Sequence, residues 1–245
     1  MTAIIFAGPS LPPAVRSSFP ALEWRPPVRQ GDFYLAALEH PGIIGVIDGY
    51  FELVPTVWHK EILWAMARGI HVYGAASIGA LRAAELAEFG MKGIGDIFDQ
   101  FRTGRLVDDD EVAVLHGPEE VNYVQVTEAM IDVRATVDAA VQMHVIGSDV
   151  AAELVQIAKS IFYKDRTYDA ILEAATERAL APDALGRFAN WLPGGRVDQK
   201  RTDAEQMLHV IARHVASGVT PMQVSYQFAH TFAWEDARRR TELEQ

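Results

Sequence analysis

The stretch Gly74-Ala75-Ala76-Ser77-Ile78-Gly79 joins the apolar run His71–Tyr73 to an alanine-rich segment typical of a helix. Small residues stand two positions on either side of Ser77, as in a nucleophile elbow, with alanine replacing the first glycine of G-x-S-x-G. An elbow puts strained backbone angles on the serine itself, so its neighbours must be small. We therefore expect Ser77 to be a nucleophile at a strand-to-helix junction.

The helix after Ser77 would also serve the reaction. The Ile78 N–H would donate to an oxyanion, and the positive end of the helix would favour developing negative charge. Two simpler roles fit the same spacing. Ser77 could be an ordinary helix N-cap worth about 1 kcal/mol, or it could line an anion-binding loop without covalent chemistry.

A nucleophilic serine needs a base at hydrogen-bond distance, so the ends of neighbouring strands are where one is expected. His59 lies in the first turn of a helix predicted to begin near Thr56, and His116 follows the apolar run in DEVAVL. Asp48 ends the strand-like run GIIGVID and would orient an imidazole, although Asp-Gly is also a common turn. We expect Asp48 and one of the two histidines to meet Ser77.

Other charged residues have less specific patterns. Arg82 and Glu85 are three apart on the predicted helix, which favours a surface ion pair, but a buried arginine there would hold a carboxylate or a carbonyl. VDDDEVAV, from Val107, resembles a cation site, yet no matching acidic cluster accompanies it. The histidines form no H-x-x-x-H or H-E-x-x-H pair, so no metal and no cofactor are expected.

Alternating elements position these residues. Apolar runs in AIIFAGPS, ALEW, GIIGVIDGYF, GIHVYGAAS and DEVAVLHGP are each followed by a turn and a segment of helical period. Continuous apolar runs are typical of strands covered on both faces. The sequence predicts an α/β fold with an open parallel, Rossmann- or flavodoxin-like sheet, whose ligands bind beyond the carboxyl ends of the strands.

From Pro118 onward the strand-like runs disappear and helical periodicity dominates. We predict an α/β core domain at residues 1–118 and a helical subdomain at 119–245. Within the second, Asn190–Gln206 reads as a linker, with Thr202 and Glu205 as a capping box for the next helix. The basic run Arg238–Arg240 is flanked by acidic residues and reads as a solvated helix end.

Composition limits the function classes. The 245 residues are 49% hydrophobic, enough for a substantial core, and the absence of cysteine excludes disulfides and thiol chemistry. The net charge of -11 disfavours nucleic acid and anionic lipid as partners. No apolar run is long enough for a membrane span, and no signal peptide is evident. A cytoplasmic location is expected.

Longer motifs carry a resemblance. GPSL, IDGYFE, VWHKEILWAMARGIHVYGAASIGALRAAEL, GMKGIGDIFDQFRTGRLVDDDEVAVLHGP and QKRTDAEQML together resemble the TfuA-like family. The resemblance implies a partner of YcaO enzymes, which use ATP to activate peptide amides, in thioamide formation on ribosomal peptides or on methyl-coenzyme M reductase. It implies hydrolysis of the thiocarboxylate on a ThiS-type sulfur-carrier protein, liberating sulfide for YcaO.

The family pattern covers the residues already singled out. Ser77 would be the nucleophile, His59 the base with His116 as alternative, and Asp48 the orienting acid. The remaining substrate or oxyanion residues would be Gly74, Ile78, Gly79, Arg82, Glu85 and Lys200. Arg82 would anchor the carrier terminus, and Lys200 or Arg201 would reach the crevice from the helical half.

Two other functions remain open at this stage. The protein could be a non-catalytic recruiting or allosteric subunit that binds the carrier and YcaO. A Rossmann-like nucleotide binder is disfavoured because the sequence has neither a G-x-G-x-x-G nor a Walker pattern. The sequence leaves a homo-oligomer open.

Overall fold

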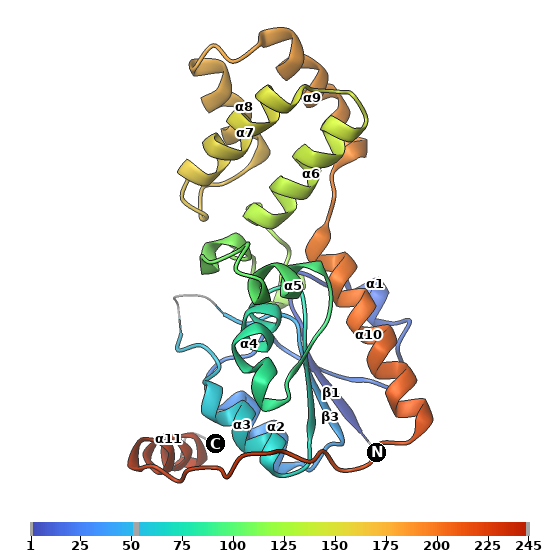
Figure 1. The fold of residues 1–245 in the computed structure, drawn as a ribbon, viewed down its shortest axis with the longest axis vertical. Helices are drawn as coiled ribbons and strands as arrows, with labels where there is room; N and C mark the ends of the chain where they lie inside the picture. The colour runs from blue at the N-terminus through green and yellow to red at the C-terminus, as the bar shows by residue number, and fades with distance from the viewer. Residues whose placement is uncertain (1, 51–53, 244–245) are drawn as a thin grey trace. The chain divides into compact units, whose positions relative to one another are not determined.

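A computed structural model describes residues 2–50 and 54–243 and contains a five-stranded parallel sheet (Figure 1). The strand order is β2-β1-β3-β4-β5, the doubly wound order whose switch point lies between β1 and β3. The predicted α/β class is confirmed. The strands are β1 (Ala3–Phe6), β2 (Glu23–Arg25), β3 (Ile43–Val46), β4 (His71–Gly74) and β5 (Lys92–Gly93).

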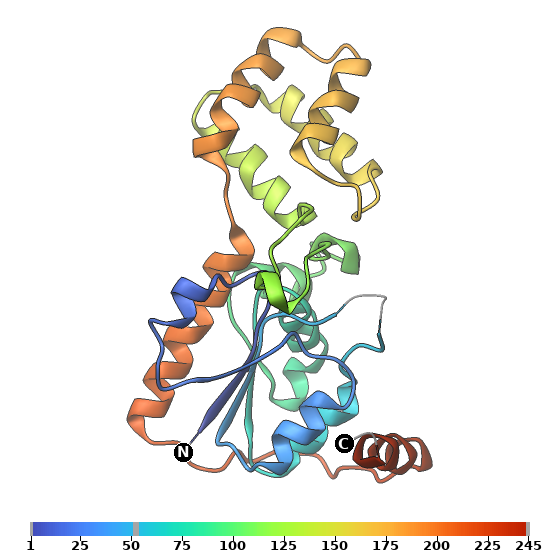
Figure 2. The same cartoon turned by 180° about the vertical axis from the view of Figure 1, so that it is seen from behind.

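Helices cover both faces of this sheet because its side chains alternate between two apolar cores. Ile4 and Phe6 point into a core with α2, α3 and α4, whereas Ala3 and Ile5 point into a second core with α10. Figures 1 and 2 show these helices on opposite sides of the strands. The helices of this part are α1 (Pro13–Arg16), α2 (Asp32–Leu38), α3 (His59–Ala67), α4 (Ile78–Leu86), α5 (Asp96–Arg102), α10 (Gln199–Ser217) and α11 (Phe232–Leu243), with the 3-10 turn η1 (Ala87–Phe89).

One predicted strand is wrong. The run in DEVAVLHGP forms the 3-10 turn η2 (Asp109–Glu111) followed by irregular chain, and His116 makes only an isolated bridge to Gln125. The fifth strand is instead β5, two residues long, which pairs with Tyr73 and Gly74. So short a strand has no apolar run by which to recognise it.

The chain divides into two compact units, at boundaries that differ from the predicted ones. The α/β unit comprises residues 1–107 and 201–245, and the helical unit comprises 108–200. The sequence predicted 1–118 and 119–245. The difference arises because α10 supplies Ala204, Met207 and Ile211 to the second core of the sheet, which would otherwise lie exposed. The helical unit is therefore an insertion into the α/β unit.

The helical unit has an apolar core of its own, built by four helices around Leu154, Ile157 and Phe188. The predicted linker at Asn190–Gln206 is wrong, because α9 ends and α10 begins within it. The capping box is wrong too, since Asp132 on α6 accepts hydrogen bonds from the N–H groups of Gln199 and Lys200, at 2.8 and 3.1 Å, and so caps α10 from a distance. The elements are η3 (Glu119–Val121), α6 (Met130–Gln142), α7 (Ser148–Ser160), α8 (Tyr168–Glu177) and α9 (Pro182–Gly195).

The acidic run after Val107 forms an ion-pair network within the helical unit. Arg134 contacts the buried Glu111 with two hydrogen bonds of 3.0 Å, and Lys159 contacts both Glu111 and Asp110. Arg166, 1% exposed, donates to Asp110 at 2.9 Å. Burial alone would raise the pKa of Asp110, but the hydrogen bonds and charges of Lys159 and Arg166 hold it below its usual value. Asp110 and Glu111 of the run are thus paired with the unit's own cations, whereas Asp108 and Asp109 are exposed.

Two further features follow from the helices. Arg238 and Arg240 on α11 pair with Glu235, Glu242 and Asp236, which confirms the solvated helix end. Within the described residues, none of the helices combines the length and the apolar character that a membrane crossing requires.

Candidate functional site

Asp48 lies at the switch point of the sheet, directly after β3, and is 1% exposed. Its Oδ2 accepts hydrogen bonds from the N–H groups of Gly8 and Ser10, at 2.8 and 3.1 Å, and its Oδ1 accepts one of 2.6 Å from the Ser10 hydroxyl. The carboxylate therefore fixes the loop after β1. The expected contact with His59 does not form, because both Asp48 oxygens serve this loop.

Ser77 stands at the junction between β4 and α4, as predicted, but the backbone strain falls on its neighbour. Ala76 has φ +66°, in the left-handed region, whereas Ser77 has φ -109°. Ser77 occupies the N-cap position of α4, yet its side chain makes no capping hydrogen bond, and the residue is 4% exposed. The apex of the turn is therefore an alanine, and the serine follows it.

Gly74 and Gly79 allow α4 to approach the sheet closely. A Cβ on Gly79 would lie 1.9 Å from the Val46 carbonyl oxygen, and one on Gly74 would lie 2.1 Å from the Gly79 carbonyl oxygen. The Gly79 N–H donates to the Ile47 carbonyl at 3.3 Å, so it is not an open oxyanion donor. Ile78, the expected donor, is the first residue of α4. The glycines of this motif serve packing.

His59, Arg82 and Glu85 form a cluster that joins α3 to α4. Glu85 Oε2 lies 2.7 Å from His59 Nε2 and 2.7 Å from Arg82 Nη1, so one carboxylate oxygen serves both. Arg82 is 8% exposed and also donates from Nε to the Val57 carbonyl at 3.2 Å. Arg82 thus holds both a carboxylate and a carbonyl, as expected of a buried arginine at this position.

The contact with Glu85 determines the tautomer of His59. An ionised carboxylate only accepts hydrogen bonds, so Nε2 carries the proton and the neutral ring has its lone pair on Nδ1. Nδ1 makes no hydrogen bond to any residue of 2–50 or 54–243. Burial alone would raise the pKa of Glu85, but the hydrogen bonds and charges of His59 and Arg82 hold it below its usual value. The His59 imidazole is therefore oriented by a carboxylate.

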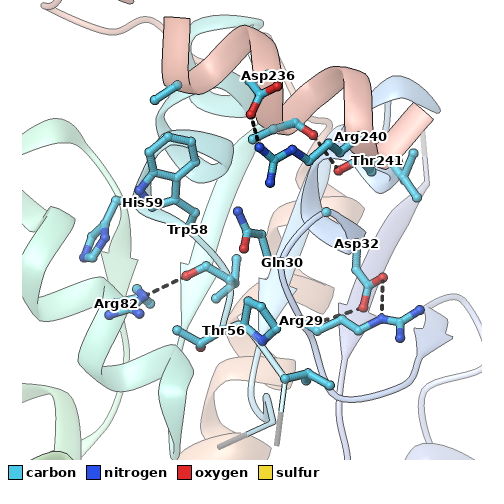
Figure 3. A pocket seen from close by; sticks show the side chains of 17 residues that line it. Arg29, Gln30, Asp32, Thr56, Trp58, His59, Arg82, Asp236, Arg240 and Thr241 are labelled. Atoms are coloured by element: carbon cyan, nitrogen blue, oxygen red, sulfur yellow. Dashed lines mark hydrogen bonds and ion pairs between the residues drawn. The ribbon is translucent and has the colours of Figure 1, made fainter. Parts of the chain in front are cut away.

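A cavity of about 980 Å³ opens beside this cluster (Figure 3). We call it the His59 cavity. Its volume is in the range of small-molecule and peptide sites. Neither Ser77 nor Asp48 is among the described residues that line it. The lining comprises residues 29–32, Leu35, residues 54–59, Arg82, and Ala233, Asp236, Ala237, Arg240 and Thr241 of α11.

Glu61 ties two walls of the His59 cavity together. Its Oε2 accepts from the N–H groups of Gly31 and Tyr34, at 2.9 and 3.2 Å, and its Oε1 accepts from the Trp58 N–H at 3.1 Å. The side chain is buried, which raises its pKa to about 7 although the three N–H groups favour the ionised form. One carboxyl group thereby fixes the starts of α2 and α3.

Two of the expected site residues belong to the helical unit. His116 Nδ1 lies 2.7 Å from the Gly117 carbonyl, and its ring packs edge-on against Tyr123. Lys200 is 1% exposed and donates from Nζ to the Val112 carbonyl at 2.9 Å. One of the three donors of its ammonium group is thus used inside this unit, and the expected role of Lys200 at a crevice stays a prediction.

Sequence reasoning missed several groups around the His59 cavity. Glu85 was expected to pair with Arg82 but not with His59, which is 26 residues away. Gln30 lies in no motif, Trp58 lies in a quoted motif but was given no role, and Arg240 was interpreted only as part of a solvated helix end. The Arg82–Glu85 spacing was the one local signal that pointed to this cluster.

The comparisons agree with the motifs quoted above. Residues 48–167 match the family described as TfuA-like protein, a range that includes His59, Arg82 and Glu85. A search of curated proteins gives no match. The match supports the identification of the chain as a TfuA-like protein, and with it a role and a partnership in a YcaO-related pathway.

Proposed function

We propose that this protein is a thiocarboxylate hydrolase that releases sulfide from a ThiS-type sulfur-carrier protein for a YcaO enzyme. The observation that carries the proposal is His59, whose Nε2 is held by Glu85 while Nδ1 is available as a base beside a cavity. Hydrolysis of an acyl–sulfur bond needs a base and a positive group near the developing oxyanion. His59 and Arg82 are residues of these two types.

In the proposed reaction His59 Nδ1 accepts a proton from water, whose oxygen attacks the carbonyl carbon of the thiocarboxylate. The C–S bond then breaks, the second proton of the attacking water passes to sulfur, which leaves as hydrosulfide, and the carrier ends in a carboxylate. The proton returns from His59 to solvent. Glu85 stabilises the imidazolium, and the Arg82 guanidinium offsets the charge that develops on the carbonyl oxygen.

The route through Ser77 is a second form of the same reaction. The Ser77 hydroxyl would attack and form an acyl-enzyme, which water would then hydrolyse. We favour direct attack by water, because Ser77 is buried and is absent from the lining of the His59 cavity among the described residues. The two forms of the reaction predict different rates of sulfide release when the Ser77 hydroxyl is removed.

The test is sulfide release from thiocarboxylated carrier by purified protein, with no YcaO present. We expect His59→Ala to lower kcat by about 100-fold or more, as for loss of a general base. Ser77→Ala should release sulfide at close to the wild-type rate, and His230→Ala, which alters an exposed histidine paired with Glu235 at 3.0 Å, is the matched control. Thermal melts exclude misfolding as the cause.

A specific observation favours one other function. The Ser77 junction is closely packed, with alanine at its apex, and Asp48 is used by the loop after β1. A protein without a catalytic serine could serve as a recruiting subunit that binds the carrier and YcaO. In that case purified protein would bind carrier but release no sulfide, and the His59 substitution would change neither result.

A further inference from the structure

The segment that joins α10 to α11 runs past one end of the sheet and contains no helix or strand (Figures 1 and 2). We call residues 218–231 the C-terminal strap. None of its side chains is fully buried, although Met222 and Val224 pack partly against the core with α2, α3 and α4. Few buried apolar contacts are typical of segments that open locally while the rest of a protein stays folded. The strap therefore depends on its polar contacts.

Two of these contacts lie close together near the end of α10. The Met222 N–H donates to the Gly69 carbonyl at 2.8 Å. Two residues earlier, the Thr220 carbonyl oxygen lies 2.8 Å from His71 Nε2, at the start of β4. The strap is thus attached in part by a histidine, the side chain whose charge ordinarily changes between about pH 5 and 8.

The contact with Thr220 determines where His71 carries its proton. A carbonyl oxygen only accepts hydrogen bonds, so Nε2 is the donor and the neutral ring has its lone pair on Nδ1. Nδ1 is buried and has no hydrogen-bond partner in residues 2–50 or 54–243. A proton added to Nδ1 would therefore leave a buried N–H without an acceptor, which destabilises the closed strap.

His214, in the last turn of α10, is also arranged to stay neutral. Lys92 Nζ lies 3.4 Å from the Tyr73 hydroxyl oxygen, and an ammonium group only donates. The Tyr73 hydroxyl is therefore the donor to His214 Nδ1, which lies 2.9 Å away. A proton on this Nδ1 would break that hydrogen bond. The His214 ring also packs edge-on against His71, with the ring centroids 4.7 Å apart.

The charges around the two rings further oppose protonation. β4 contributes His71 and Tyr73, β5 contributes Lys92, and the residues of β3 paired with His71 and Tyr73 are uncharged. Burial, followed by the charges of His71 and Lys92, lowers the pKa of His214. Two imidazolium rings in contact beside an ammonium group would repel one another. The closed arrangement therefore takes up protons less readily than an open one.

We propose that His71 and His214 form a proton-sensitive latch, which holds the C-terminal strap against the sheet at neutral pH and releases it on acidification. Release separates Thr220 from His71 and frays the last turn of α10, so that water can accept from both protonated rings. The open form binds more protons, so the closed form is favoured above the ordinary histidine pKa of about 6.5 and loses this advantage below it. The latch does not depend on the proposed hydrolase activity.

The Met222 amide reports on the strap, because its hydrogen bond to Gly69 forms only when the strap is closed. We would measure its hydrogen-exchange protection factor at about pH 7.5 and about pH 5.5, corrected for the intrinsic exchange rate. Protection should fall about tenfold for each histidine that takes up a proton only in the open form. The Ile47 amide, bonded to the Phe6 carbonyl at 2.9 Å, should stay more protected than Met222 at both pH values, which identifies the opening as local.

The test variant combines His71→Gln with His214→Gln, which removes both titrating groups and keeps polar side chains. Its Met222 protection should be the same at both pH values. Because the measured quantity is the ratio between the two pH values, a variant that is less protected at both still gives an answer. His209→Gln is the matched control, since His209 is an exposed histidine of α10 outside this cluster. It should show the wild-type pH dependence.

A permanent charge gives a second, independent test. His214→Lys places an ammonium group beside Lys92 at every pH, so Met222 protection at about pH 7.5 should fall about tenfold, whereas His209→Lys should leave it unchanged. Met222 protection in wild type that does not vary with pH would overturn the latch. The same conclusion would follow if the double glutamine variant kept the full pH dependence, or if His214→Lys were as well protected as His209→Lys.

Discussion

The packing of α4 on the sheet can be tested at Gly79. An alanine Cβ there would lie 1.9 Å from the Val46 carbonyl oxygen and 2.7 Å from its carbon. Both are backbone atoms, so relief requires α4 itself to move outward. Alanine in a helix normally gains about 1 kcal/mol over glycine, but overpacking costs about 1–3 kcal/mol or more. We expect the free energy of unfolding to fall by about 2 kcal/mol, because this overlap is severe.

The same substitution should impair the proposed site, because α4 carries Arg82 and Glu85. An outward shift of this helix would lengthen the 2.7 Å contact between Glu85 and His59. We would measure urea unfolding by tryptophan fluorescence together with sulfide release by the folded variant. Four of the five tryptophans lie in the α/β unit, so fluorescence reports mainly on that unit.

Gly186→Ala is the control for Gly79→Ala. Gly186 lies in α9 of the helical unit, is exposed, and would place a Cβ with nothing within 4 Å. Alanine there should stabilise the protein by about 0.5–1 kcal/mol and leave sulfide release unchanged. A Gly79→Ala protein as stable as wild type would refute the argument that this glycine is required by backbone contact.

Three further outcomes are expected. Glu85→Gln should lower kcat for sulfide release about tenfold or more, because the amide no longer stabilises the His59 imidazolium, while carrier binding measured by calorimetry stays unchanged. Burial raises the pKa of Glu61 to about 7, so the folded state holds the Glu61 proton more tightly than the unfolded state does. The free energy of unfolding should therefore fall as the pH rises from about 4.5 to about 7. Urea titrations across this pH range should show a smaller decline in the free energy of unfolding for the Glu61→Gln variant than for wild type. Lys200→Met should leave Asp132 without its cation and destabilise the helical unit by about 3 kcal/mol in thermal melts.

Much of the fold could be predicted because burial leaves a direct mark on the sequence. The strands β1 and β3 are apolar runs, and Ile43 and Ile44 face opposite cores, which explains why their run does not alternate. The Arg82–Glu85 pair was also visible, since residues three apart on a helix are neighbours. These signals come from residues that are close together along the chain, so they can be recognised in a single sequence.

Three of the misses depend on contacts between distant segments. Asp132 caps α10 from 67 residues away, so no capping motif marks the true start of that helix. Asp48 was paired with the wrong partner, because a carboxylate at a strand end can equally bind the loop of the adjacent strand. The insertion of 108–200 was hidden because α10 has the same helical periodicity as the helices before it.

The family match covers only part of the residues that line the cavity. The match covers the proposed base, its carboxylate and Arg82, but it reaches neither Gln30 nor the α11 wall. The proposed base, its carboxylate and Arg82 therefore lie inside the shared region, whereas the α11 wall of the cavity beside them lies outside it. A shared reaction can thus be combined with a cavity wall supplied by another part of the chain.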